Sequence, residues 1–158
     1  MRLTQTMATL LLAASLPLFV RAQEQQPAPF ENEIKAFEQS DKTNPPPKDA
    51  VLFVGSSSIR LWKTLEQDMP GMKVINRGFG GSQVEHSVRY ADRIVLPYRP
   101  KLIVFYAGDN DIAAGKTPNR VLEDFKAFVA KVKTALPNTK ILYVSIRPSV
   151  ARCPMRLH

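Results

Sequence analysis

The feature that most constrains the fold is an alternation of short strand-like runs with amphipathic segments. The first run, residues 50–54, is continuously apolar, as in a parallel strand that is covered on both faces. Because strands that alternate with helices build parallel sheets through right-handed crossovers, the sequence predicts an α/β domain. The predicted strands are 50–54, 73–76, 101–106 and 140–146, and the predicted helices are 58–67, 84–95 and a longer one that starts near residue 117.

Helix-start signals support this division. Ser82 and Glu85 have the spacing of a capping box, which predicts that Ser82 caps the second helix. Thr117 and Pro118 suit the N-cap and the first position of the third helix. Further upstream, apolar residues at helical spacing between 30 and 37 predict a short N-terminal helix.

The N-terminus has the pattern of a secretory signal peptide. Arg2 precedes an apolar stretch at 7–20, and Val20-Arg21-Ala22 resembles a cleavage site. The apolar stretch is short for a bilayer span, which favours a signal peptide over a transmembrane anchor. We therefore predict that residues 1–22 are removed, that the protein is secreted or periplasmic, and that no stable membrane anchor remains. Residues 23–49 are interpreted as a linker followed by the short N-terminal helix.

Composition excludes several classes of site. The 158 residues suit one domain, and the single cysteine rules out an intramolecular disulfide framework or a cysteine-based zinc site. With two histidines there is little material for a metal centre, and we predict neither metal nor cofactor. The net charge is +8, but the basic residues are scattered among acidic ones without a basic run. This pattern predicts a solvated surface and no nucleic-acid partner.

Three glycine-rich or polar segments follow successive predicted strands, at 55–58, 78–82 and 108–111. The carboxyl ends of parallel strands share one edge of a sheet, where ligands bind in open α/β folds. Each segment alone would be read as an ordinary turn. Together they supply a serine hydroxyl, glycine N–H groups and an asparagine amide, which are parts of an acyl-transfer site. Neither the Walker pattern nor the dinucleotide fingerprint is present in the required context.

At these residues the chain resembles the SGNH (GDSL-type) hydrolase family. The resemblance covers residues 50–148 and implies Ser57 as nucleophile, Gly81 as backbone oxyanion donor and Asn110 as side-chain oxyanion donor. Ser56 stands where the family usually has aspartate. The resemblance further implies a three-layer α/β/α fold with strand order 2-1-3-4-5. It also implies hydrolysis of a small-molecule, glycan or lipid ester without a cofactor.

The sequence departs from the family in its last block. The family's Asp-x-x-His, which supplies the general base and its orienting acid, is absent, since Gln83 precedes His86 by three residues and Met155 precedes His158. We interpret residues 149–158 as an aberrant tail and His86 as a surface or site-rim residue. The hypothesis is a truncated or frameshifted hydrolase that lacks the fifth strand and has little or no esterase activity. Apolar surface is then expected to be exposed at the fourth strand.

Alternative interpretations remain at this stage. The chain could be a non-catalytic remnant that binds sugars or lipids, or a non-functional fragment. Arg60 and Trp62 suit the rim of the site, and equally suit helix surface and core packing. Asp109 and Asp111 are weak evidence for a metal site, because two acids without further ligands do not specify one.

Overall fold

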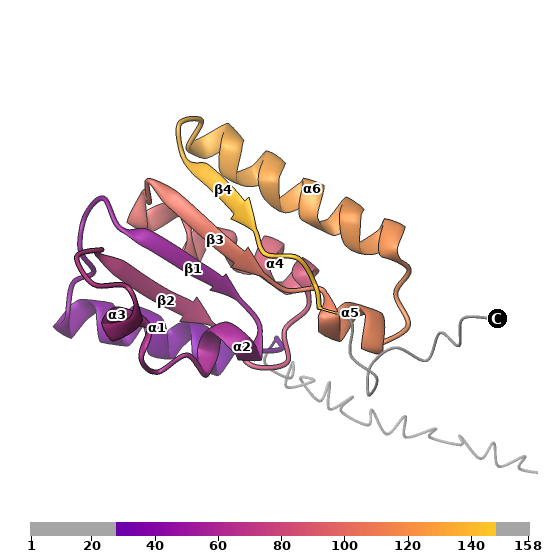
Figure 1. The fold of residues 1–158 in the computed structure, drawn as a ribbon, viewed down its shortest axis with the longest axis horizontal. Coiled ribbons are helices and arrows are strands. Elements are labelled where there is room, and N and C mark those ends of the chain that lie inside the picture. The colour runs from indigo at the N-terminus through magenta and orange to yellow at the C-terminus, as the bar shows by residue number, and fades with distance from the viewer. Residues whose placement is uncertain (1–27, 148–158) are drawn as a thin grey trace, which may run out of the picture.

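The computed structural model describes residues 28–147, which form a four-stranded parallel sheet flanked by helices (Figure 1). The strand order is β2-β1-β3-β4, which confirms the predicted α/β fold and the order 2-1-3-4 for these strands. The strands are β1 (Val51–Gly55), β2 (Val74–Gly78), β3 (Leu102–Tyr106) and β4 (Lys140–Tyr143). The predicted signal peptide and the predicted aberrant tail lie outside the described residues.

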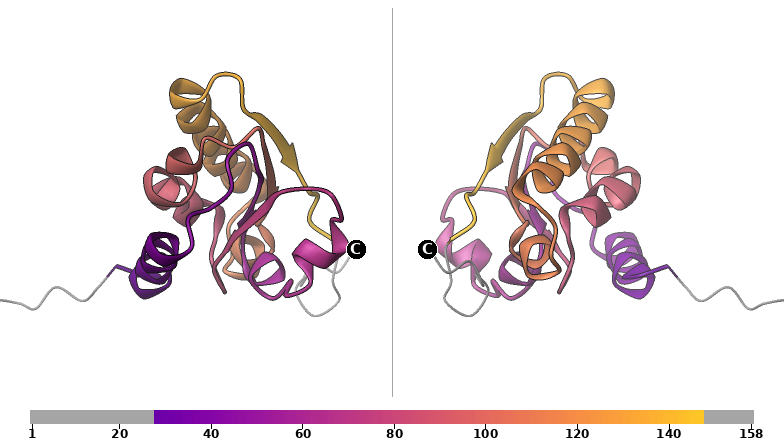
Figure 2. Two further views of the ribbon diagram at one scale, coloured as in Figure 1. Left: turned by 90° about the vertical axis from the view of Figure 1, so that its left-hand side faces the viewer. Right: turned by 90° about the vertical axis from the view of Figure 1, so that its right-hand side faces the viewer.

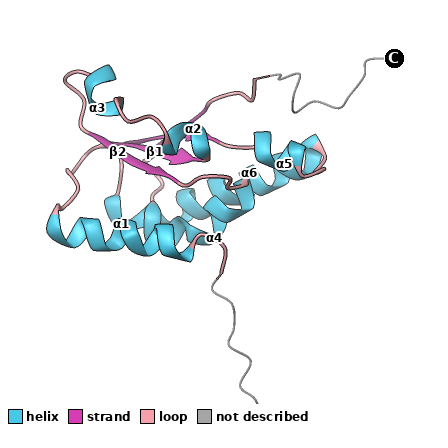
Figure 3. Ribbon diagram, turned by 90° about the horizontal axis from the view of Figure 1, so that it is seen from below, coloured by secondary structure: helices cyan, strands magenta, loops and turns pink. Residues whose placement is uncertain are grey.

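Helices cover both faces of the sheet, unequally. Among the described helices, α1 (Glu31–Thr43), α4 (Val84–Ile94) and α6 (Pro118–Ala135) cover one face, and α2 (Ser57–Arg60) and α3 (Leu65–Asp68) cover the other (Figures 2 and 3). The 3₁₀ helix η1 (Leu96–Tyr98) follows α4, and α5 (Asp109–Ala113) follows β3. Within residues 28–147, no helix combines the length and apolar character needed to cross a bilayer.

The two faces bury two hydrophobic cores. All five residues of β1 are buried, because β1 is a central strand with a core on each side. Alternate strand residues therefore point to opposite cores. On the larger core, Phe105 of β3 packs with Phe128 of α6 at a ring-centroid distance of 4.7 Å. The smaller core joins Val51 and Phe53 of β1 to Ile59 of α2.

The predicted helix at 58–67 is wrong, since two short helices stand there. The break lies around Trp62, whose ring packs edge-on against Phe53 at a centroid distance of 5.6 Å. The indole Nε1–H donates to Asp68 Oδ2 (2.5 Å), and the Thr64 hydroxyl donates to the same oxygen (2.7 Å). These hydrogen bonds, first that from Thr64 and then that from Trp62, lower the pKa of Asp68. The side-chain bonds hold a turn that apolar periodicity does not reveal.

The N-terminal helix α1 packs into the larger core. Ile34 is fully buried, and Arg93 of α4 forms ion pairs with Glu31 (2.9 Å) and Glu38 (2.6 Å) of α1. A second arginine, Arg77 of β2, pairs with Asp41 near the end of α1. The hydrogen bonds from Arg93 lower the pKa values of both glutamates. These contacts fix α1 against α4 by charge as well as by apolar burial.

The fourth strand leaves apolar side chains exposed. Leu142 is 54% exposed and Val144 40% exposed. Leu142 pairs in register with Val104, so it lies on the face of the sheet that α2 and α3 cover. Among the described strands, β4 pairs with β3 alone. This is the apolar exposure at the fourth strand that the sequence predicts.

Candidate active site

The candidate nucleophile lies where β1 ends and α2 begins. Gly55, the last residue of β1, has φ 150°, and a Cβ there would lie 1.9 Å from the Tyr106 carbonyl oxygen. Glycine therefore lets the end of β1 approach β3 closely, and the Ser56 N–H donates to the same oxygen (3.0 Å). Ser56 is fully buried, whereas Ser57, the first residue of α2, is partly exposed. The serine that resembles the family's nucleophile is thus the accessible one.

Hydrogen bonds tie the second segment to the first. The Phe79 N–H donates to the Gly55 carbonyl oxygen (3.0 Å), and the Ser82 hydroxyl lies 3.4 Å from the same oxygen. The Ser82 hydroxyl also donates to the Phe79 carbonyl oxygen (2.8 Å), closing the loop on itself. The loop after β2 is therefore held beside the start of α2.

The third segment is tied to both of the others. The Ser56 hydroxyl lies 3.4 Å from Asp109 Oδ1, and the Asn110 side-chain amide donates to the Ser82 carbonyl oxygen (3.0 Å). Both acceptor and donor belong to α5, which the sequence suggested as a turn and the structure shows as a short helix. All three predicted segments thus converge at the carboxyl edge of the sheet, as expected for parallel strands.

The three glycines of the second segment are required for different structural reasons. A Cβ on Gly78 would lie 2.3 Å from the Arg60 backbone nitrogen, and a Cβ on Gly80 would lie 2.5 Å from Arg60 Nε. These two glycines let α2 pack directly against the loop. Gly81 has φ 77°, and a Cβ there would meet nothing within 4 Å. Gly81 therefore has a left-handed backbone conformation, with open space where a side chain would be.

The start of α4 differs from the prediction. The capping box of Ser82 and Glu85 is wrong, because α4 begins at Val84 with Gln83 as its N-cap. The Gln83 N–H donates to Nδ1 of His86, which supplies the reciprocal contact of a capping box (2.9 Å). The Ser82 hydroxyl is engaged inside its own loop instead. A sequence search for a capping box expects glutamate or glutamine at the third helical position, so it does not detect this one, in which His86 occupies that position.

Asp111 binds the start of α4 and is a structural residue that the sequence did not reveal. It is fully buried and accepts hydrogen bonds from the Val84 N–H (3.1 Å) and from the Lys116 ammonium (3.1 Å). Lys116 also contacts Asp124 (3.1 Å) and Glu85 (3.1 Å). Although burial lowers the pKa of Lys116, hydrogen bonds to these three carboxylates raise it above its ordinary value. The weak suggestion of a metal site at Asp111 is replaced by a buried ion pair.

Of the two residues that the sequence suggests for the rim of the site, Trp62 lies away from the site and Arg60 lies next to it. Trp62 points toward α3 and lines a pocket of about 180 Å³ with Leu65 and Val74, away from the carboxyl edge. Arg60 lies over Gly80, next to the candidate oxyanion residue Gly81. Arg60 is therefore the one of the two that adjoins the converged segments.

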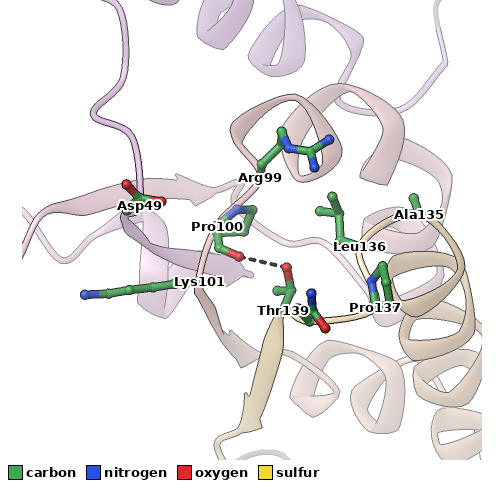
Figure 4. A pocket seen from close by; sticks show the side chains of 9 residues that line it. Asp49, Arg99, Pro100, Lys101, Ala135, Leu136, Pro137 and Thr139 are labelled. Carbon is green, nitrogen blue, oxygen red and sulfur yellow. Dashed lines mark hydrogen bonds between the residues drawn. The ribbon is translucent and has the colours of Figure 1, made fainter.

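A second pocket, of about 220 Å³, lies at the amino ends of the strands. Asp49, Arg99 and Lys101 line it, and the Thr139 hydroxyl donates to the Pro100 carbonyl oxygen there (2.7 Å; Figure 4). These residues precede β1, β3 and β4, so this pocket is at the opposite edge from Ser57. Within residues 28–147, no group of three or more His, Cys, Asp or Glu side chains could hold a metal ion.

His86, which the sequence predicts at the surface or at the rim of the site, is partly buried near the start of α4. Its ring packs edge-on against Phe30 at 4.8 Å, and its side chain is 19% exposed. Burial lowers the pKa of His86 below its ordinary value near 6.5, and the charge on Lys116 acts in the same direction, against Glu85 and Asp111. The Nδ1 atom accepts a hydrogen bond in the neutral form, which protonation would remove.

The pH dependence of stability follows from His86. Because its folded-state pKa is lowered, the unfolded chain binds the proton first as the pH falls. The free energy of unfolding should be highest above pH 6.5, should decrease as the pH falls toward the lowered pKa, and should level off below it. His86→Gln, whose amide oxygen can accept the Gln83 hydrogen bond, should reduce this slope. Urea titrations of both proteins across this range measure the difference, and equal slopes would contradict the assignment.

The sequence profile of the GDSL-like Lipase/Acylhydrolase family matches residues 53–157. No curated protein matches the chain.

Several solved structures share the fold. A Streptococcus pneumonia protein whose name refers to platelet activating factor is 24% identical, with a TM-score of 0.65, over 74% of this chain and 55% of its own. A GDSL-like lipase from Bacteroides thetaiotaomicron is 19% identical (TM-score 0.60) over 70% of this chain and 56% of its own. The SGNH-hydrolase family esterase AlinE4 is 18% identical (TM-score 0.56) over 66% and 62%. The chain thus spans between about half and two thirds of the length of these proteins.

Proposed function

Since this chain belongs to the GDSL-like lipase/acylhydrolase family, whose members are hydrolases that act on esters, we propose that it carries a serine ester-hydrolase site centred on Ser57. The observation that supports this most is the hydrogen-bonded convergence of the segments after β1, β2 and β3. Through Gly55, Ser82 and Asn110, each segment is bonded to at least one of the others. A set of independent turns would not require these links.

In the proposed reaction, the Ser57 hydroxyl attacks the ester carbonyl carbon and gives its proton to solvent water, and the carbonyl oxygen becomes an oxyanion. The Gly81 N–H and the Asn110 amide stabilise that negative charge, since neutral donors placed at a developing oxyanion lower the barrier. Collapse of the intermediate expels the alcohol, which takes a proton, and leaves an acyl-serine. Water then attacks the acyl-serine and releases the acid.

The proton from Ser57 needs a general base, and the 158-residue sequence contains no Asp-x-x-His segment to supply one. His86 does not take this role in the proposal, because its Nδ1 atom accepts the Gln83 N–H and its ring packs on Phe30. A serine hydroxyl without a base is a poor nucleophile. We therefore propose that this chain by itself turns over esters slowly.

The proposed substrate is an ester of a small molecule, a glycan or a lipid, and the proposed location is secreted or periplasmic. The location depends on the signal-peptide pattern of residues 1–22. No nucleic-acid partner is proposed.

A chromogenic short-chain ester assay tests the proposal. Serine proteases that lose a triad member keep only about 10³- to 10⁴-fold of rate over water, mainly from the oxyanion hole and binding. We expect a comparably small residual rate here. Without a base this rate comes mainly from direct attack by water at the oxyanion site, so Ser57→Ala should change it little, whereas Asn110→Ala should lower it by at least about tenfold. Thermal melts of each variant control for folding. Fast turnover that Ser57→Ala abolishes would show that a base is present, and a residual rate unaffected by Asn110→Ala would contradict the oxyanion assignment.

A further inference from the structure

Arg60 is a cation placed beside the candidate oxyanion loop. Ser57 and Arg60 stand at positions i and i+3 of α2, which puts their side chains on the same side of this short helix. The Arg60 guanidinium lies over Gly80: a Cβ built on Gly80 would be 2.5 Å from Nε, 2.8 Å from Cζ and 2.9 Å from Nη2. The absence of a side chain at Gly80 is what lets the guanidinium lie there.

The guanidinium lies beside Gly81, the residue proposed to bind the oxyanion. Consecutive Cα atoms are about 3.8 Å apart, so Gly81 is only one residue from the glycine over which the guanidinium lies. Within residues 28–147, the Arg60 guanidinium makes no ion pair or hydrogen bond with another side chain, whereas Arg77 and Arg93 are both paired with acids. Arg60 is exposed to solvent. A planar fork of donors placed in this way suits a carboxylate or phosphate.

We propose that Arg60 forms an anion-binding subsite of the Ser57 centre and that this site prefers esters carrying a negatively charged group within a few bonds of the carbonyl. This inference rests on the proposed function, because it places the ester carbonyl at Gly81. The anionic group belongs either to the acyl chain or to the alcohol, and both use the same chemistry. The subsite gives substrate preference and takes no part in the bond-making steps.

The test uses unreactive amide analogues, so that binding is measured independently of turnover. N-phenylsuccinamic acid carries a carboxylate on its acyl chain, 2-acetamidobenzoate carries one on the leaving-group side, and N-phenylbutanamide is neutral. Titration of the full-length chain, followed by amide NMR signals and calorimetry, gives each dissociation constant. We expect at least one anionic analogue to bind about tenfold more tightly than the neutral one, and the difference to shrink as salt is raised.

Variants assign the preference to Arg60. Arg60→Gln should bring the anionic and neutral analogues to equal affinity, and Arg60→Lys should keep part of the preference. Arg89→Gln removes an exposed arginine from α4, on the opposite face of the sheet from α2 (Figure 3), and should leave the preference unchanged. Thermal melts of each variant show whether it is folded.

The outcomes separate the subsite from the site itself. If the neutral analogue shifts the Gly81 and Asn110 signals but anionic analogues bind no better, the subsite is wrong and the proposed site stands. If Arg60→Gln weakens all analogues equally, Arg60 acts structurally and the subsite is also wrong. If no analogue shifts those signals, both proposals fail.

Discussion

Replacing Asp111 with alanine is expected to destabilise the domain by about 2–3 kcal/mol, because a buried N–H loses its acceptor while Lys116 keeps its contacts with Asp124 and Glu85. Asp111 is fully buried, and its carboxylate accepts from the Val84 N–H and the Lys116 ammonium. The variant leaves a helix N–H and a largely buried ammonium without this acceptor. Urea unfolding followed by circular dichroism measures the loss.

An exposed ion pair provides the control. Asp92 is 62% exposed and pairs with Lys131 at 2.6 Å, so Asp92→Ala should cost no more than about 1 kcal/mol. A loss of similar size in both variants would show that Asp111 contributes as a surface acid does. The larger loss at Asp111 would instead establish it as the link between α5 and α4.

Replacing Gly78 with alanine is expected to cost about 3 kcal/mol, at the upper end of the usual range for overpacking. The new Cβ would lie 2.3 Å from the Arg60 backbone nitrogen and 2.7 Å from the Ile59 carbonyl carbon. Backbone atoms cannot rotate out of the way, so α2 must shift, and with it Ser57 at its first position. A fall in the thermal melting temperature measures the effect.

Gly80→Ala is the matched control for Gly78→Ala, since Gly78 ends β2, Gly80 lies in the loop that follows, and both glycines lie against Arg60. At Gly80 the added Cβ meets the guanidinium, the mobile end of a side chain, which can move aside. We expect a loss below about 1 kcal/mol. Equal losses of stability in the two variants would show that α2 can shift at little energetic cost. The position of α2 would then not be fixed by Gly78.

The sequence predicts the sheet well because its strands are determined locally. The apolar runs are short and separated by segments of different periodicity, so their existence and parallel order follow from pattern alone. The predicted edges differ from the observed ones by a few residues, as with the fourth strand, which ends at Tyr143 and not at residue 146. Apolar periodicity does not reveal the break between α2 and α3, because the break depends on the hydrogen bonds that Trp62 and Thr64 donate to Asp68.

The candidate site was predictable only in outline. Parallel strand ends determine that Ser57, Gly81 and Asn110 lie at one edge, and this needs no knowledge of side-chain contacts. The role of Asp111 depends on the start of α4, which is 27 residues earlier in the chain, and no local pattern reports such a contact. The position of the Arg60 guanidinium likewise depends on Gly80, which lies in the loop after β2.

The central proposal is that Ser57 acts as a nucleophile once a general base is supplied, and adding imidazole tests this most directly. Imidazole in solution can accept the serine proton in place of the missing histidine. Initial rates of short-chain ester hydrolysis are measured over a range of imidazole concentrations for the wild-type chain and for Ser57→Ala, with the rate in imidazole alone subtracted. We predict that the wild-type rate rises with imidazole while the Ser57→Ala rate does not. Equal responses of the two proteins would contradict the account.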